Sequence, residues 1–223
     1  MSVVHPAAQG IYLVTDSALC GERGVVPTAV AAVGAGIGTV QVRDKHATAR
    51  ELCELVLRVS LAVGQNAAVL VNDRVDVFLA ARAEGAAVHG VHIGQDDLAP
   101  EQVRRIVGAG PVVGLTVSTT GELARAEALS RGTIDYLGMG VIHPTATKPD
   151  ASGVIGTAGF GALTELTALP TVAIGGITVR DVAALRAAGA SGIAVVSAIC
   201  GQPAPAAAAA GLVAEWESCG ACR

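Results

Sequence analysis

A loop rich in hydroxyl groups follows the buried-strand pattern DYLGMGVI, in the segment HPTATKPDASG at residues 143–153. Thr145 and Thr147 offer hydroxyl groups, the loop backbone offers N–H groups, and Lys148 adds a positive charge. Many loops of this composition are simple connections between elements. Because charged and neutral donors together bind anions well, we expect this loop to hold one anionic group and Lys148 to reach toward a second.

Three polar residues alternate in the segment QVRDK, where Gln41, Arg43 and Lys45 are two positions apart. If the chain stays extended, alternate residues point to the same side, so these three side chains share one side. The simpler alternative is a solvated strand end that carries ordinary charges. The functional interpretation is an anion site, with a bidentate guanidinium from Arg43 and a point charge from Lys45.

Amide and acidic side chains follow the next two apolar runs: Asn72 and Asp73 in VNDR, and Asp96 and Asp97 in GQDDL. Taken singly, each pair is typical of a helix N-cap. Taken together and beside the basic residues, the carboxylates suit Mg²⁺, which binds one or two carboxylates plus substrate oxygens. A metal site next to an anion site suggests a diphosphate ligand.

Two further segments offer backbone groups to an anion. Gly175 and Gly176 in AIGGI allow a ligand to approach the chain closely. Val196 and Ser197 in VVSAI are expected to open a helix, whose N-terminus would bind phosphate. We therefore predict two anion sites, one of them with a metal.

Alternating elements must position these residues. Short β-rich runs are expected at 11–15, 39–43, 68–72, 90–94, 111–117, 135–140, 171–176 and 192–198. Helix-like segments lie between them, for example 48–64 with its 3.6-residue periodicity and 99–110 with an early Pro and a late Gly. Eight such units predict a single-domain (β/α)8 TIM barrel over residues 1–223, and an open doubly wound sheet is the alternative. Residues 201–223 are expected to be a loop, an Ala-rich helix up to Trp216 and a Cys-containing tail.

Composition narrows the functional classes. The 223 residues are 52% hydrophobic and 2% aromatic, with a net charge of −4, which gives no basic surface for nucleic acid. We expect no membrane span, since no apolar run reaches about 18 residues, and no secretory signal, hence a cytoplasmic protein. The oligomeric state is open, and a homo-oligomer is compatible with the sequence. Cys219 and Cys222 form a C-x-x-C pair at a chain end expected to fray, and no function is assigned to them.

The ordered motifs resemble the thiamine-phosphate synthase family from about Tyr12 to Ile199. The motifs that carry the resemblance are YLVTD, QVRDK, VNDR, GVHIGQDDL, HPTATKPD, AIGGI and GIAVVSAI. The resemblance implies a transferase that joins hydroxymethylpyrimidine diphosphate to hydroxyethylthiazole phosphate with Mg²⁺. In that family the diphosphate is thought to leave first, and the thiazole nitrogen then attacks the resulting cation.

The resemblance also implies roles for residues. Those matched to the pyrimidine diphosphate are Gln41, Arg43, Lys45, Asn72 and Lys148, of which Arg43, Lys45 and Lys148 would be catalytic. Those matched to Mg²⁺ are Asp73 and Asp97, and those matched to the thiazole phosphate are Thr145, Thr147, Gly176, Val196 and Ser197.

The sequence departs from the family pattern in three regions. Thr116 stands where the family has a serine, and we expect it to contact the pyrimidine substrate; Ser118 replaces a histidine. The segment before the fourth strand is a few residues longer than usual and contains His89. His143 replaces a phenylalanine, and we expect its side chain to pack in the wall of the site.

The alternative functions are a thiazole tautomerase, a non-catalytic sensor of thiamine phosphate, and a phosphosugar isomerase. Intact diphosphate and Mg²⁺ residues and the absence of a placed acid–base pair weigh against them.

Overall fold

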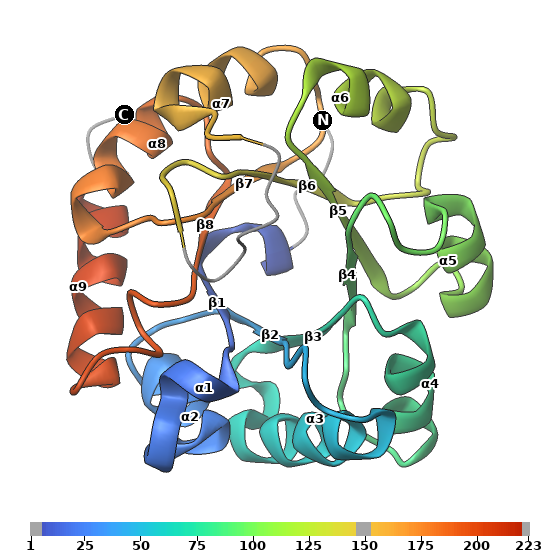
Figure 1. The fold of residues 1–223 in the computed structure, drawn as a ribbon, viewed down its shortest axis with the longest axis vertical. Helices are drawn as coiled ribbons and strands as arrows, with labels where there is room; N and C mark the ends of the chain where they lie inside the picture. The colour runs from blue at the N-terminus through green and yellow to red at the C-terminus, as the bar shows by residue number, and fades with distance from the viewer. Residues whose placement is uncertain (1–5, 146–152, 220–223) are drawn as a thin grey trace.

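Short runs rich in Val, Ile and Ala form eight parallel strands that close into one barrel. A computed structural model describes residues 6–145 and 153–219. The strands are β1 (Gly10–Val14), β2 (Thr39–Val42), β3 (Ala68–Asn72), β4 (Gly90–Ile93), β5 (Val112–Val117), β6 (Tyr136–Gly140), β7 (Thr171–Ile174) and β8 (Gly192–Val195). Each strand pairs with the next and β8 pairs with β1, as Figure 1 shows along the barrel axis. The predicted (β/α)8 barrel is confirmed.

Helices surround the barrel (Figure 1). They are α1 (Ser17–Cys20), α2 (Val25–Gly34), α3 (Ala49–Val63), α4 (Val75–Ala83), α5 (Pro100–Val107), α6 (Thr120–Glu127), α7 (Gly156–Thr164), α8 (Val182–Ala187) and α9 (Pro205–Ser218). Short 3-10 segments are η1 (Pro6–Ala8), η2 (Gly21–Arg23), η3 (Gly64–Asn66) and η4 (Val179–Asp181).

Local sequence signals explain where two expected helices begin and end. A capping box between Thr48 and Glu51 starts α3, whose Leu52, Val56 and Val59 face the core, as the periodicity predicted. Pro100 opens α5 and Gly108 follows its end. The terminal helix was expected to begin after a low-complexity loop, but α9 already begins at Pro205. Proline suits the first turn of a helix, and alanine has the highest helix propensity.

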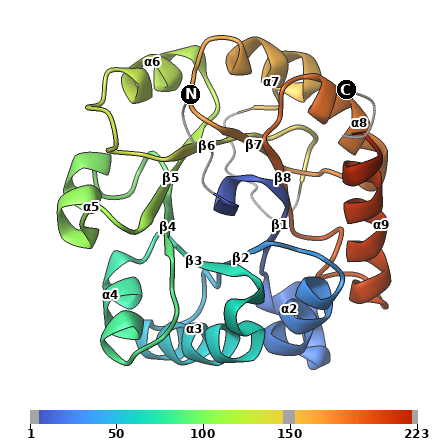
Figure 2. The same ribbon diagram turned by 180° about the vertical axis from the view of Figure 1, so that it is seen from behind.

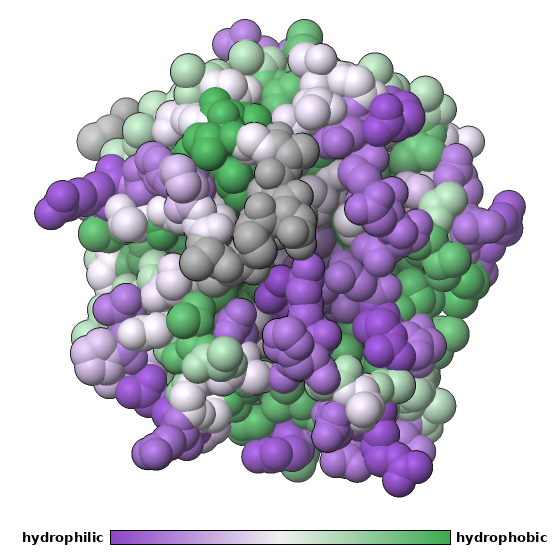
Figure 3. Space-filling model, viewed as in Figure 1, coloured by the Kyte–Doolittle hydropathy of each residue, from purple (hydrophilic) through white to green (hydrophobic). Residues whose placement is uncertain are grey.

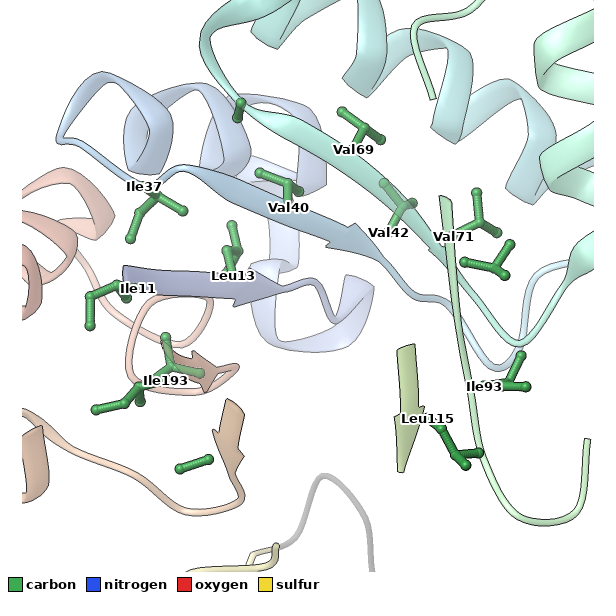
Figure 4. Packing of buried hydrophobic residues seen from close by; sticks show 14 of the residues in the cluster. Ile11, Leu13, Ile37, Val40, Val42, Val69, Val71, Ile93, Leu115 and Ile193 are labelled. Atoms are coloured by element: carbon green, nitrogen blue, oxygen red, sulfur yellow. The ribbon is translucent and has the colours of Figure 1, made fainter. Parts of the chain in front are cut away.

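The outward faces of the strands form the main core with the helices. Ile11 and Leu13 on β1 and Val40 and Val42 on β2 are fully or nearly fully buried and alternate with residues that face the barrel interior. Figure 4 shows these side chains packed between the strands and the surrounding helices. Each fully buried Val, Ile or Leu contributes about 1.5–3 kcal/mol of transfer free energy.

The inward faces fill the barrel with a smaller cluster that combines two large rings with mostly small side chains. Tyr12 from β1 and Tyr136 from β6 belong to this second cluster, together with small residues from several other strands. The cluster continues into Ala7 and Ala8 of η1, which lies across the amino end of the barrel in Figure 2. The interior is therefore a packed core, and ligands must bind at the opposite, carboxyl end.

The longer connection before β4 lies at the amino end of the barrel. His89 immediately precedes β4, and its Nδ1 accepts a hydrogen bond from the Val69 N–H at 3.0 Å. His92 pairs in register with Asn72, so the alignment of β4 that leads to Asp97 is regular. The extra residues thus lie on the side of the barrel away from the strand ends where ligands bind.

In the described parts of the chain, every helix is too short or too polar to cross a bilayer.

Candidate active site at the carboxyl end of the barrel

The predicted site residues gather where the strands end toward the viewer in Figure 1. Figure 3 shows the same face, on which hydrophilic side chains gather toward the centre. The described members come from the ends of β2, β3 and β5 and from the connections after β2, β3, β4, β6, β7 and β8. Thr147 and Lys148 lie outside the described residues.

The end of β2 is held by the end of β1. The Thr15 hydroxyl donates to the Arg43 carbonyl at 3.1 Å and accepts from the Arg43 N–H at 2.9 Å, while Thr15 itself is fully buried. The Arg43 guanidinium lies 3.7 Å from the Asp16 carboxylate, and its side chain is 13% exposed. Asp16 therefore aims the Arg43 side chain before any ligand arrives.

The alternating pattern expected through Lys45 is wrong in one respect, because β2 ends at Val42. Gln41 points into the barrel and is 4% exposed, but Lys45 is exposed and comes from a loop. Asp44 shapes that loop, since its carboxylate accepts hydrogen bonds from Ser17 Oγ at 2.5 Å and from the His46 N–H at 3.0 Å.

Two carboxylates meet after β3 and β4. Burial first, then the negative charge of Asp97 and a hydrogen-bonding contact with it, raise the pKa of Asp73 from 3.8 to about 6. A hydrogen bond from Asn72 and the positive charge of Lys45 act in the opposite direction. The four side chains therefore lie close together, although β2, β3 and β4 each supply only part of the group.

Neither carboxylate is a helix cap, which was the simpler alternative. The N-cap of α4 is Arg74 and that of α5 is Ala99, both without a side-chain capping bond. Asp73 has a φ of 59°, a conformation that non-glycine residues rarely adopt and that is over-represented at functional sites. The Asp97 carboxylate accepts a hydrogen bond from the Gly94 N–H at 2.6 Å.

This group fits Mg²⁺ by the chemistry of its donors. Mg²⁺ keeps several waters and binds proteins through one or two carboxylates plus substrate phosphates, and Asp73 with Asp97 is such a pair. The described residues hold no cluster of three or more His, Cys, Asp or Glu side chains that would enclose a metal without substrate. Asp73 is partly buried and Asp97 is exposed, and two like charges this close gain from a cation between them.

A cavity lies across the barrel mouth from the carboxylates. Five of the predicted residues line it, namely Thr116, Thr145, Gly176, Val196 and Ser197. Ser118, which the sequence placed where the family has a histidine, lines the same cavity. The described residues matched to the second anion thus share one cavity, and Thr116 lies in its wall.

The glycines after β7 are required by space. Gly176 has a φ of 66°, and a Cβ there would meet His143 Cβ at 2.8 Å and the Pro144 carbonyl at 3.1 Å. A Cβ on Gly175, whose φ is 101°, would meet Val141 at 2.4 Å. Glycine therefore lets the β7 connection lie directly against the β6 connection and expose its backbone to the cavity.

The expected helix after β8 is wrong. Val196 accepts hydrogen bonds from the N–H groups of Ile199 and Cys200, so Ser197 opens a single turn, and the next helix begins only at Pro205. The low-complexity segment between them lacks the periodic apolar residues that would extend this turn. Ser197 nevertheless lines the cavity.

His143 does more than pack against the wall. Its ring Nε2 lies 2.8 Å from the Asp181 carboxylate, and its backbone N–H donates to the Gly175 carbonyl at 3.0 Å. These two contacts tie the β6 connection to the β7 connection and to η4. The expectation of simple wall packing is therefore incomplete.

The sequence interpretation missed three interior residues, because it considered only strand ends. Gln41 Nε2 lies 2.5 Å from the hydroxyl of Tyr12, which lies 3.1 Å from that of Tyr136. His92 Nδ1 lies 2.8 Å from the Tyr136 hydroxyl, and its Nε2 lies 2.9 Å from Thr116 Oγ1. The available signal was a histidine at the inward position of GVHIG, since a polar side chain inside a barrel needs a partner.

Known proteins resemble this chain over most of its length. A family model described as thiamine monophosphate synthase matches residues 11–199. A thiamine-phosphate synthase of Azorhizobium caulinodans is 44% identical over 200 residues, which cover 89% of this chain and 91% of that protein. One from Psychrobacter sp. is 39% identical over 208 residues, covering 93% and 95%.

Solved structures agree as well. A thiamine phosphate pyrophosphorylase from Pyrococcus furiosus superposes with a TM-score of 0.82 at 30% identity, covering 96% of this chain and 98% of that one. A 3-hexulose-6-phosphate synthase structure superposes with a TM-score of 0.67 at 16% identity, which shows a shared fold only. The expected resemblance over Tyr12–Ile199 is confirmed by the extent of the family match.

Proposed function

We propose which site residues bind each of the two substrates, given that the chain belongs to the thiamine monophosphate synthase family and has thiamine-phosphate synthase activity. In this proposal the basic residues and carboxylates after β2, β3 and β4 bind hydroxymethylpyrimidine diphosphate. The cavity across the mouth binds hydroxyethylthiazole phosphate. One observation supports this proposal most strongly. The carboxylate pair and the glycine-lined cavity lie at the same end of one barrel.

The pyrimidine diphosphate is assigned to Gln41, Arg43, Lys45, Asn72 and Thr116. Arg43 offers a planar donor fork that matches diphosphate oxygens, and Asp16 holds it in place. Lys45 lies on an exposed loop and adds a point charge. The family resemblance adds Lys148 as a third cation. These positive groups stabilise negative charge that grows on the leaving diphosphate.

Asp73 and Asp97 would hold Mg²⁺. When bound, the ion supplies charge neutralisation at the leaving diphosphate. The two carboxylates anchor it through oxygen ligands and leave positions for substrate oxygens. Asn72 supports the pair, because its side chain hydrogen-bonds to Asp73.

The thiazole phosphate is assigned to Thr145, Thr147, Gly176, Val196 and Ser197. Backbone N–H groups at glycine turns and hydroxyl groups are neutral donors that suit a phosphate monoester. A neutral set of donors here keeps the cations for the diphosphate, so the two phosphorylated substrates bind in different places.

The reaction that this arrangement supports is a dissociative substitution. The bond between the pyrimidine methylene carbon and the diphosphate oxygen breaks, and its electron pair leaves with the diphosphate. The thiazole nitrogen then donates its lone pair to the pyrimidine cation and forms the new C–N bond. No proton must be removed, because that nitrogen carries none. Holding both substrates in place supplies orientation that can reach about 7–11 kcal/mol in good intramolecular systems.

The Gly176→Ala variant tests the thiazole half. The new methyl group would meet His143 at 2.8 Å, so we expect the KM for the thiazole phosphate to rise about tenfold or more. The KM for the pyrimidine diphosphate should change little. Steady-state kinetics with each substrate varied in turn measures both constants.

The Gly132→Ala variant is the matched control. Gly132 also has a positive φ, 83°, but a Cβ there meets nothing within 4 Å, so it reproduces the backbone strain without the crowding. A Gly176→Ala enzyme whose KM for the thiazole phosphate matches that of Gly132→Ala would remove Gly176 from the phosphate site.

The cellular setting proposed is the cytoplasm. The described cysteines Cys20, Cys53, Cys200 and Cys219 are all free thiols, which suits a reducing compartment. Cys222 lies outside the described residues. A homo-oligomer stays a proposal from the sequence.

A further inference from the structure

Five hydrogen-bonded side chains cross the inside of the barrel, and we call them the interior network. In order along its hydrogen bonds, the network consists of Gln41 on β2, Tyr12 on β1, Tyr136 on β6, His92 on β4 and Thr116 on β5. Its first member belongs to the proposed pyrimidine site, and its last member lines the cavity. Thr116 is also assigned to the pyrimidine substrate, so the network joins two proposed pyrimidine contacts through the core, one of them in the cavity wall.

The barrel is built to make room for this network. A Cβ on Gly114 would lie 2.3 Å from the Tyr136 ring and 2.5 Å from His92 Nδ1. A Cβ on Gly138 would lie 2.8 Å from His92 Cε1. Glycines on β5 and β6 thus face the two rings, and any larger residue would displace them.

Each hydroxyl of the network keeps its proton. Tyr12 and Tyr136 are 2% and 0% exposed, and burial raises the pKa of both phenols well above the ordinary value. Every buried O–H therefore needs an acceptor, and the order of hydrogen bonds must satisfy this at each step.

The amide nitrogen of Gln41 sets the direction. It can only donate, so the Tyr12 oxygen accepts, and the Tyr12 proton is directed to Tyr136. Tyr136 then donates to His92 Nδ1. A neutral imidazole whose Nδ1 accepts carries its proton on Nε2, and that N–H donates to Thr116 Oγ1. The opposite direction would require the Gln41 carbonyl Oε1 next to the Tyr12 hydroxyl, where the structure places the amide nitrogen.

We propose that the interior network fixes His92 as the neutral Nε2–H tautomer and thereby presets the Thr116 hydroxyl to donate to an acceptor atom of the pyrimidine substrate, with Tyr136 as the positioning residue. Thr116 Oγ1 accepts from His92, so its own proton points elsewhere, and Thr116 lies in the cavity wall. The link to the substrate rests on the proposed assignment of Thr116; the tautomer and its direction do not.

Nitrogen-15 NMR of the histidine-labelled full chain at pH 8 tests the tautomer directly. Loss of signals in a His92→Gln variant identifies the His92 resonances among the five histidines. We expect the Nε2–H pattern in the wild type and a mixture of tautomers in Tyr136→Phe, which removes only the phenolic oxygen. An Nδ1–H or imidazolium pattern in the wild type would overturn the proposal, whatever the activity.

Kinetics tests the link to the substrate. Tyr136→Phe should lower kcat/KM for the pyrimidine diphosphate about 10- to 100-fold and leave the KM for the thiazole phosphate unchanged. The matched control is Thr39→Val, which removes a fully buried interior hydroxyl that bonds only outside the network, to the Ala7 carbonyl at 3.3 Å. Equal losses in Tyr136→Phe and Thr39→Val would assign Tyr136 a purely structural role.

Two substitutions at Thr116 separate this inference from the proposed function. Thr116→Ser keeps the hydroxyl and should retain most activity, whereas Thr116→Val should lose about 10- to 100-fold in kcat/KM for the pyrimidine substrate. Full activity in Thr116→Val together with an Nε2–H His92 would overturn the substrate assignment of Thr116 and leave the tautomer in place.

Discussion

The Asp73→Asn variant should lose about 100-fold or more in kcat. Asp73 is one of two carboxylates proposed to hold Mg²⁺, and the stabilisation that a metal gives a leaving group is worth several kcal/mol. An amide keeps the shape and the hydrogen-bonding contact with Asp97 but removes one charge. Raising the Mg²⁺ concentration should restore part of the rate. Titration of kcat against Mg²⁺ in both proteins measures these effects.

The loss should not come from unfolding. Burial and the negative charge of Asp97 raise the pKa of Asp73 to about 6, so the ionised side chain at pH 7 opposes folding of the metal-free protein. Its neutral replacement should therefore leave the thermal midpoint at pH 7 unchanged or raise it. Asp96→Asn, which removes the neighbouring exposed carboxylate, is the control and should keep full activity. Equal activity in Asp73→Asn and Asp96→Asn would refute the metal assignment.

The Arg43→Gln variant should lower kcat about 100-fold and raise the KM for the pyrimidine diphosphate. The guanidinium is only 13% exposed and is aimed by Asp16, so it acts as a preorganised charge at the leaving group. Removing one preorganised donor of this kind typically costs about 10²–10³ in rate. The KM for the thiazole phosphate should stay the same, and kinetics with each substrate varied separately distinguishes the two constants.

Arg82→Gln is the matched control for Arg43→Gln. Arg82 lies in the last turn of α4, where its guanidinium contacts the Phe78 ring outside the barrel mouth. The Arg82→Gln substitution removes one positive charge, as Arg43→Gln does, so any general electrostatic effect on anionic substrates appears in both variants. If Arg82→Gln reduced the rate as much as Arg43→Gln, the effect would come from net charge and not from a specific contact.

The sequence predicted the barrel because each element carries its own local signal. Residues such as Val69 and Val71 belong to short β-branched runs, and Thr48 with Glu51 forms a helix-start signal. These signals depend on neighbours within a few residues, so a single sequence contains them.

Side-chain convergence at the barrel mouth was predictable only in outline. The polar residues after β2, β3 and β4 were found because carboxyl ends of neighbouring parallel strands meet. The single turn at Ser197 and the end of β2 at Val42 could not be predicted. Both depend on where backbone hydrogen bonding to neighbouring segments stops.

The interior network was not predictable from spacing. Tyr12, His92 and Tyr136 are far apart in the sequence, and each resembles an ordinary core residue in its own strand. They meet because barrel closure brings β1, β4 and β6 around one axis, and because glycines at 114 and 138 leave room. Only the inward position of a polar ring in β4 gave a hint, and a single strand does not say which partner satisfies it.

The central claim is that one barrel mouth joins two phosphorylated substrates with the help of Mg²⁺. The direct measurement mixes the purified protein with both substrates, with and without Mg²⁺, and quantifies thiamine phosphate by fluorescence after oxidation to thiochrome. We predict product only when both substrates and Mg²⁺ are present, with release of one diphosphate per product. Equal product formation in EDTA, or no product from folded protein that still binds the thiazole phosphate, would contradict the account.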